Sequence, residues 1–152
     1  MKINNVLPAM PEAQQSDWSV MVDKPEAHKS EVNAMATFGN NLYTSSAKSL
    51  KIWEIDSMSC ISELTEVSSV RAIKISQKYK RLIVAAERQL IVWDLVGLTK
   101  VAVYQTPNKI SRIDLCSDNL LVVGTLGAST KGALLIFDLS KPLQPIEQKE
   151  TD

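Results

Sequence analysis

Side chains that could carry out a reaction are scarce in this sequence. The chain holds one histidine, His28, and two cysteines, Cys60 and Cys116, in unrelated contexts. A two-histidine metal site is therefore ruled out, and no cysteine lies at an obvious catalytic spacing from the histidine. We predict that the chain is not an enzyme, that His28 is not a general base, and that no metal or cofactor is bound.

A glycine-rich stretch, Gly124–Gly132, invites comparison with a phosphate-binding loop. A Walker A loop needs two glycines separated by four residues, then lysine and serine or threonine at the start of a helix. Here the spacing fails and a predicted strand follows. We therefore interpret the stretch as a hairpin loop. The basic run Lys78, Lys80 and Arg81 is likewise interpreted as a solvated turn rather than a phosphate patch.

Composition indicates a folded chain with balanced charge. The chain has 152 residues, 45% of them hydrophobic, and its 17 lysines and arginines equal its 17 aspartates and glutamates. A nucleic-acid-binding protein usually carries a basic surplus, so nucleic acid is not an expected partner. No apolar run approaches the ~20 residues of a membrane span, and residues 1–15 do not resemble a targeting signal. We expect a cytoplasmic protein with reduced cysteines, and membrane association is not expected.

The sequence repeats itself three times. The segments Leu50–Ile55, Leu90–Leu95 and Leu134–Leu139 each carry an aromatic residue followed by an acid. Their aromatic residues, Trp53, Trp93 and Phe137, lie 40 and 44 residues apart.

Each repeat also contains four β-rich runs separated by turn residues. In the first repeat these are Val32–Thr37, Leu42–Ser45, Leu50–Ile55 and Cys60–Leu64. In the second they are Val70–Ile75, Leu82–Ala85, Leu90–Leu95 and Val101–Gln105. In the third they are Ile110–Leu115, Leu121–Gly124, Leu134–Leu139 and, more weakly, Leu143–Glu147, where Pro145 permits only an edge strand.

With this period, strand number and aromatic-acid pair, residues 18–148 resemble the WD40-repeat β-propeller family. The resemblance implies an all-β fold of about three four-stranded blades, a partial ring, at residues 28–66, 67–106 and 107–148. Family blades carry a Gly-His pair and an aspartate that form a buried hydrogen-bond relay with serine or threonine and the tryptophan. Only Ala27-His28 remains of the Gly-His pair, and Ala47, Glu87 and Lys131 occupy the aspartate position. We therefore expect the relay to be absent and His28 to be a structural donor.

The resemblance also assigns positions to individual side chains. Trp53, Trp93 and Phe137 are expected to be core residues between blades. Partners of WD40 propellers usually dock at the upper rim, where the first strand of each blade begins. Residues that map to this rim are the predicted partner-binding residues: His28, Lys29, Asn33, Arg71, Glu87, Arg88, Asn108, Lys109, Ser111 and Lys131.

Three blades do not close a ring, because propellers have typically four to eight. Repeat units bury their apolar faces only against neighbours, so a partner chain or a second copy is expected to complete the ring, or else more of a longer parent polypeptide does so. Two copies could form a six-bladed ring. Trp18–Val22 is predicted to be a clasping strand or a remnant of a preceding blade. Residues 1–17 are predicted to be a flexible extension, and residues 149–152 a tail.

The predicted function is a protein-protein interaction scaffold, a WD40 module in a multiprotein assembly. The segment Leu42–Ile55 resembles propellers of TRAF-type RING ubiquitin ligases, so a ubiquitin ligase is one candidate assembly, beside a cytoskeletal or ciliary complex. The alternative is a phosphoinositide-binding propeller at a membrane surface, because the third repeat resembles propellers of the autophagy pathway. Their paired-arginine motif has no match in this chain.

Overall fold

The computed structural model describes residues 19–67, 69–117, 119–127 and 131–142 with their side chains, and the backbone of Pro145–Glu150. These residues form strands, turns and loops but no helix. The first sheet contains β1 (Ala34–Phe38), β2 (Asn41–Ser45), β3 (Leu50–Glu54) and β4 (Ser59–Leu64). The second contains β5 (Val70–Ser76), β6 (Arg81–Ala86), β7 (Gln89–Asp94) and β8 (Thr99–Gln105). The third contains β9 (Ile110–Cys116), β10 (Leu120–Thr125), β11 (Ala133–Asp138) and β12 (Pro145–Glu150).

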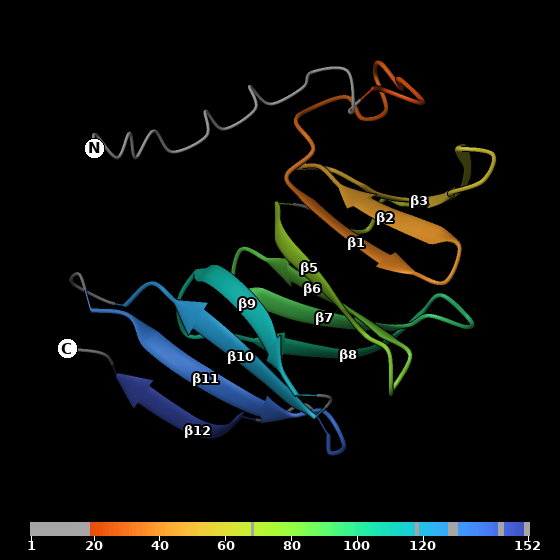
Figure 1. Ribbon diagram of the computed structural model, residues 1–152. Helices are drawn as coiled ribbons and strands as arrows, with labels where there is room; N and C mark the ends of the chain where they lie inside the picture. Colours follow the sequence, from red (N-terminus) through yellow and green to blue (C-terminus); the bar gives the residue numbers. More distant parts are fainter. Residues whose placement is uncertain (1–18, 68, 118, 128–130, 143–144, 151–152) are drawn as a thin grey trace, which may run out of the picture.

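Each sheet is an antiparallel meander, in which every strand pairs with the next one along the chain. The sheets follow one another as blades 1, 2 and 3, and their first strands lie together, with β1 against β5 and β5 against β9 (Figure 1). The prediction of an all-β fold with three four-stranded propeller blades is confirmed.

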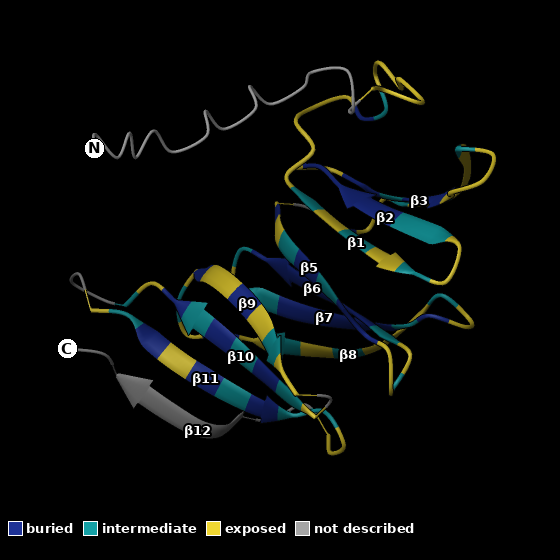
Figure 2. Cartoon of the chain, in the orientation of Figure 1, coloured by how far each residue is buried: buried dark blue, intermediate teal, exposed yellow. Residues whose placement is uncertain are grey.

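Blade 2 lies between the other two blades, and its alternating side chains therefore enter two separate cores. One face, which includes Trp93, packs with the blade 1 residues Tyr43, Leu50 and Ile52. The opposite face, with Leu90 among its residues, packs with the blade 3 face that carries Phe137. This two-sided burial explains why β6 and β7 are buried almost throughout, whereas the outer strand β8 alternates between exposed and half-buried residues (Figure 2).

The repeat is visible in the backbone as well as in the sequence. A register shift occurs immediately before the aromatic residue of the third strand in all three blades, at Trp53, Trp93 and Phe137. The acid that follows the aromatic binds the next turn: an Asp94 carboxylate oxygen accepts from the Val96 amide at 2.8 Å, and Asp138 accepts from the Ser140 amide at 2.9 Å. The acid of the repeated pair is thus a turn-stabilising residue.

Two predicted boundaries are wrong. Ser19–Val22 does not form a strand, and Val20 and Met21 are 81% and 94% exposed, so the described part of the expected clasp is not paired with any sheet. The last strand continues to Glu150, beyond the expected end at Glu147, so residues 149 and 150 belong to blade 3 rather than to a tail. Residues 1–18, which include Trp18 and the predicted flexible extension, lie outside the described residues.

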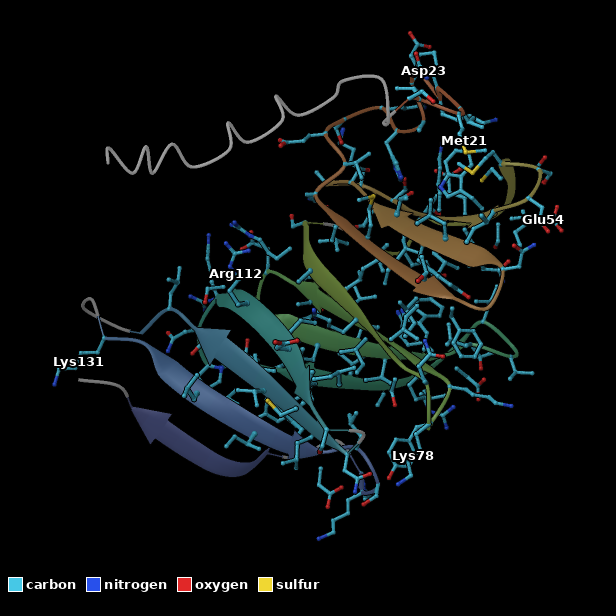
Figure 3. The ribbon with its side chains drawn as sticks, in the orientation of Figure 1. Met21, Asp23, Glu54, Lys78, Arg112 and Lys131 are labelled. Atoms are coloured by element: carbon cyan, nitrogen blue, oxygen red, sulfur yellow. The ribbon has the colours of Figure 1, made fainter. Side chains whose placement is uncertain are left out.

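The segment that does cover the end of blade 1 lies just after this stretch. Figure 3 places Met21 and Asp23 on the side of blade 1 that faces away from blade 2. Further along, the Lys51 ammonium donates a 2.7 Å hydrogen bond to the Ala27 carbonyl, and the ammonium groups of Lys24 and Lys51 each lie 5.8 Å from the centre of the Trp53 ring. Trp53 is therefore buried under this segment and not between two blades, which corrects the expectation for that residue.

Candidate interaction site

His28 is buried at the top of blade 1 and holds a hydrogen-bond relay. Its Nε2 lies 2.7 Å from the Thr44 hydroxyl, and the Trp53 indole donates to the same hydroxyl at 2.8 Å. Its Nδ1 lies 3.4 Å from the Ser49 hydroxyl. The expectation that the relay is absent is therefore wrong for blade 1. Ser49, four residues before the tryptophan, takes the role that sequence reasoning sought at Ala47, six before it.

The Thr44 hydroxyl links the ring to the indole. The indole can only donate, so the hydroxyl accepts from Trp53 and also forms the hydrogen bond with Nε2, while the Ser49 hydroxyl forms the one with Nδ1. Both ring nitrogens are occupied and the side chain is only 7% exposed, so His28 is a structural residue and does not offer its ring to a partner at the rim.

Blade 2 lacks this relay. Val84 stands where blade 1 has Thr44, and the buried Trp93 indole nitrogen finds no hydrogen-bond partner among the described residues. In blade 3 no such hydrogen bond is needed, because the phenyl ring of Phe137 has no hydrogen-bond donor. At the equivalent position, blade 1 therefore has an indole with a hydrogen-bond partner, blade 2 an indole without one, and blade 3 a phenyl ring.

Three of the predicted rim residues meet in an ion cluster that joins blades 2 and 3. The Glu87 carboxylate lies 3.5 Å from the Arg71 guanidinium and 3.3 Å from the Lys109 ammonium. Arg71 belongs to β5, Glu87 to the loop between β6 and β7, and Lys109 to the loop before β9. The hydrogen bond from Lys109, reinforced by the charges of Lys109 and Arg71, lowers the pKa of Glu87 below its ordinary value.

The backbone of Glu87 is unusual for a residue with a side chain. Its φ is +49°, in the left-handed region that favours glycine, and its carbonyl accepts a 2.7 Å hydrogen bond from the Ile110 amide of blade 3. Residues in this region are costly and occur often at functional sites. Here the strained loop holds the carboxylate between two cations of different blades.

Asn33 lies beside this cluster and joins blade 1 to blade 2. Its amide nitrogen donates to the Val70 carbonyl at 2.7 Å, and its amide oxygen accepts from the Ser45 hydroxyl at 3.0 Å. With Arg71 and Glu87 it lines a small hollow of about 240 Å³. Its amide is therefore part of the blade junction, although the residue itself is exposed.

The other predicted rim residues are dispersed. Arg88 is exposed and lines, with Glu87 and Glu66, a second hollow of about 340 Å³. The Asn108 carbonyl accepts from Thr106, and the Ser111 hydroxyl donates to the Gly124 carbonyl at 3.1 Å, so both take part in local structure. The remaining two, Lys29 and Lys131, are exposed, and Figure 3 shows Lys131 on the loop before β11, at the blade 3 end of the array.

A groove that sequence reasoning missed descends from the cluster along the inner strands. It measures about 570 Å³ and brings residues of all three blades together, among them Met35, Arg71, Lys74, Arg112 and Asp114. Lys74 and Asp114 pair across blades 2 and 3 at 3.3 Å, whereas no ion pair to Arg112 is formed within the described residues. The alternating residues of Ile110–Leu115 are the sequence feature that could have predicted this groove, because every second residue of an inner strand faces the same side.

Other kinds of site find no support in the described part of the chain. No group of three potential metal ligands occurs within it. It also contains no helix long and apolar enough to cross a membrane.

Comparison with solved structures places this arrangement among known folds. RRP9 WD40 repeats superpose with a TM-score of 0.69 at 11% identity over 80% of this chain and 39% of that chain. Kuenenia stuttgartiensis hydrazine synthase gives 0.72 at 20% identity over 80% of this chain and 37% of that one. The computationally designed Ika4 protein gives 0.64 at 17% identity over 82% and 75% of the two chains.

These likenesses define the fold: the chain consists of blades of a WD40-type β-propeller. It spans less than two fifths of the hydrazine synthase chain and of Kluyveromyces lactis Hsv2, another structure that it resembles, with 37% of each covered. The identities are too low to carry function from any of these proteins to this one. No protein-family model matches the sequence, and no curated protein matches it either.

Proposed function

We propose that this chain is a protein-interaction scaffold in a multiprotein assembly and that it binds its partner at the upper rim. The observation that carries the proposal is the Arg71–Glu87–Lys109 cluster, where a strained loop and two blades converge on one carboxylate. Such a cluster is ordered by three backbone segments, and ordered polar residues on a rigid scaffold suit recognition of a partner.

The charge of the surface favours an acidic partner segment. Arg88 is exposed next to the cluster, and Arg112 lies further along the groove with no carboxylate bound to it in the described residues. Arginine binds carboxylates through two parallel hydrogen bonds, which gives both affinity and orientation. A peptide segment with aspartate or glutamate spaced to reach both arginines is therefore the partner chemistry that we propose.

A ubiquitin ligase, or a cytoskeletal or ciliary complex, is the kind of assembly that we propose. Support for a ubiquitin ligase comes from the sequence resemblance of Leu42–Ile55 alone. A partner chain that completes the ring belongs to the same proposal.

The test compares two charge reversals of equal size. Chemical cross-linking followed by affinity purification and mass spectrometry identifies partners of the wild-type chain. The rim variant Arg88→Glu/Arg112→Glu should lose those partners, because both changes place acid against an acidic ligand. The control Lys78→Glu/Lys80→Glu reverses two exposed charges at the opposite rim and should retain them.

Loss of the partners with the control and their retention with the rim variant would contradict the proposal. Binding to vesicles that contain phosphoinositide, abolished by the rim variant and by salt, would instead support the membrane alternative. Thermal unfolding of both variants shows whether either change acts through folding.

A further inference from the structure

The turn between the third and fourth strands takes the same path in blades 1 and 2. Four residues after the acid of the repeated pair, Met58 and Leu98 each have φ +51°, in the left-handed region. Leu98 is half-buried and packs against the core that blades 1 and 2 share. The turn of blade 2 therefore covers part of the core beside the preceding blade.

Blade 3 has Pro142 at the position of Leu98, and its turn takes a different path. The pyrrolidine ring fixes φ at about −65°, so proline cannot adopt the left-handed conformation. The turn is also one residue longer, counted from the aromatic residue to its partner in the fourth strand, which is Lys100 in blade 2 and Pro145 in blade 3. Pro142 is exposed, so it does not cover the core as Leu98 does.

A hollow of about 390 Å³, called the side pocket, lies between blades 2 and 3 beside this turn. Val92, 6% exposed, and the half-buried Ala102 line it from blade 2, and Leu139 and Pro142 line it from blade 3. Val101 is the extra residue of a bulge in β8 and also lines the pocket, with its side chain 48% exposed. Both walls belong to neighbouring blades of this chain, so the side pocket does not depend on any further blade.

Hydrogen bonds between the blades hold the mouth of the side pocket. The Tyr79 hydroxyl donates to the Asn119 side-chain oxygen at 2.9 Å, and the Leu139 amide donates to the Asn119 carbonyl at 2.7 Å. Tyr79 and Leu139 both line the pocket, so Asn119 ties its two walls together. Walls that are already ordered lose little conformational entropy when a ligand binds, which favours binding.

The charged residues that line the side pocket, within the described part of the chain, are both cations: Arg81 and Lys141. Their carboxylate neighbours, Asp94 and Asp138, do not line it and accept from turn amides. The Arg81 guanidinium is held by Asp94 at 2.8 Å. The Lys141 ammonium, in contrast, lies 3.7 Å from Asp138, and its side chain is 68% exposed. Lys141 therefore offers a cation to a ligand at the edge of an apolar surface.

We propose that the side pocket binds a partner polypeptide through one large aliphatic or aromatic side chain, with an adjacent aspartate or glutamate paired to Lys141. β8 is the edge strand of its sheet, so a polypeptide reaches the pocket from the outer surface of the molecule. Part of the wall is itself exposed, so the pocket covers one side chain of a longer segment rather than enclosing a small molecule.

The side pocket is separate from the ion cluster at the upper rim. Arg81 begins β6, and Glu87 follows its last residue, so the two sites lie at opposite ends of that strand. Binding at the side pocket therefore does not depend on binding at the rim.

Selection of peptides tests the proposal. A phage-displayed library of random peptides is selected on the purified chain, after depletion on Val101→Asp, which places a carboxylate at the pocket. The enriched sequences should carry leucine, methionine, phenylalanine or tyrosine next to an acid. A synthetic peptide of the most frequent sequence should shift the NMR amide signals of Val101, Ala102 and Leu139.

Two valines of β8 form a matched pair for the affinity measurement. Val101 and Val103 are 48% and 47% exposed, but of the two only Val101 lines the side pocket. Val101→Asp should weaken binding of the synthetic peptide by about tenfold or more, because it brings a charge to the apolar contact and repels the acid of the peptide. Val103→Asp should leave binding unchanged. Fluorescence anisotropy measures both affinities, and thermal unfolding shows whether both variants are folded.

Two further variants separate the apolar contact from the charged one. Ala102→Leu fills the side pocket and should abolish binding while Tm holds or rises. Lys141→Glu should weaken binding by about fivefold at low salt and less at high salt, because the pair that it removes is exposed.

Equal losses for the two valine variants, or enriched peptides without an acid beside the apolar residue, would overturn the proposal. Absence of any enriched sequence would also overturn it. If anionic lipid vesicles bound instead, and Val101→Asp abolished that binding, the occupant would be a lipid rather than a polypeptide. The rim variant Arg88→Glu/Arg112→Glu should bind the synthetic peptide like the wild type, so failure of the proposed function would not change these results.

Discussion

His28 is the only histidine of the chain, and its two ring nitrogens have different partners. Burial, with the nearby Lys51 charge, lowers the pKa of His28 from its ordinary value of 6.5. The neutral ring is therefore part of the folded structure of blade 1.

The sign of the pH effect follows from this lowered pKa. His28 binds its proton more tightly in the unfolded chain than in the folded chain. The contribution of neutral His28 to the free energy of unfolding is therefore complete above pH 6.5. It declines as the pH falls from 6.5 through the folded-state pKa of His28. We predict that Tm falls across this window in the wild type and is flatter in His28→Gln, measured by circular dichroism. Equal slopes in the two proteins would contradict the role given to His28.

The two tryptophans provide a matched pair at equivalent positions. Trp53→Phe removes an indole that donates to Thr44, whereas Trp93→Phe removes one with no partner. Both changes lose similar ring volume, so the loss of unfolding free energy should be larger for Trp53→Phe by about 1 kcal/mol. Urea unfolding of both variants measures the difference.

Trp93→Ala leaves a cavity in the core between blades 1 and 2. It should lower the free energy of unfolding by roughly 3–5 kcal/mol, measured in the same way.

At the scale of the element, the hairpin loop of β6 and β7 combines strain with charge. Glu87 adopts a left-handed backbone at φ +49°, which glycine adopts without strain. Glu87→Gly should therefore keep or raise Tm, while it frees Arg71 and Lys109 for the acidic partner segment and strengthens partner binding. Glu87→Asn, which tolerates the same backbone but lacks the charge, should behave likewise. A clear fall in Tm for both would show that the ion cluster supports the fold rather than binding.

The whole molecule depends on its central blade, because both cores use blade 2. Leu50→Ala lies in the core between blades 1 and 2, and Leu135→Ala in the core between blades 2 and 3. Both side chains are fully buried, so each change should cost about 2–5 kcal/mol. Since blade 2 joins the cores, each variant should lower one common unfolding transition, followed by circular dichroism and hydrogen exchange. Loss of only the mutated half would show that the two cores unfold independently.

The sequence by itself determined the fold class, the strands and the blades. The reason is physical: a 40–44-residue period, an aromatic-acid pair and alternating apolar residues are local features typical of WD40 blades. The positions of Arg71, Glu87 and Lys109 at one rim also followed from the repeat. Their meeting in one cluster did not, because it depends on how blades 2 and 3 lie against each other.

Only the tertiary structure decided what each end of the array presents. The relay around His28 escaped sequence reasoning because Ser49 reaches the ring from a different position than the expected aspartate. Arg112 escaped because the groove that it lines is formed only where residues of all three blades meet. Leu50, Leu90 and Leu134 are indistinguishable as a pattern, and packing alone buries the first two and leaves the third accessible. A face is buried by its neighbour, and the sequence of one blade does not encode whether that neighbour is present.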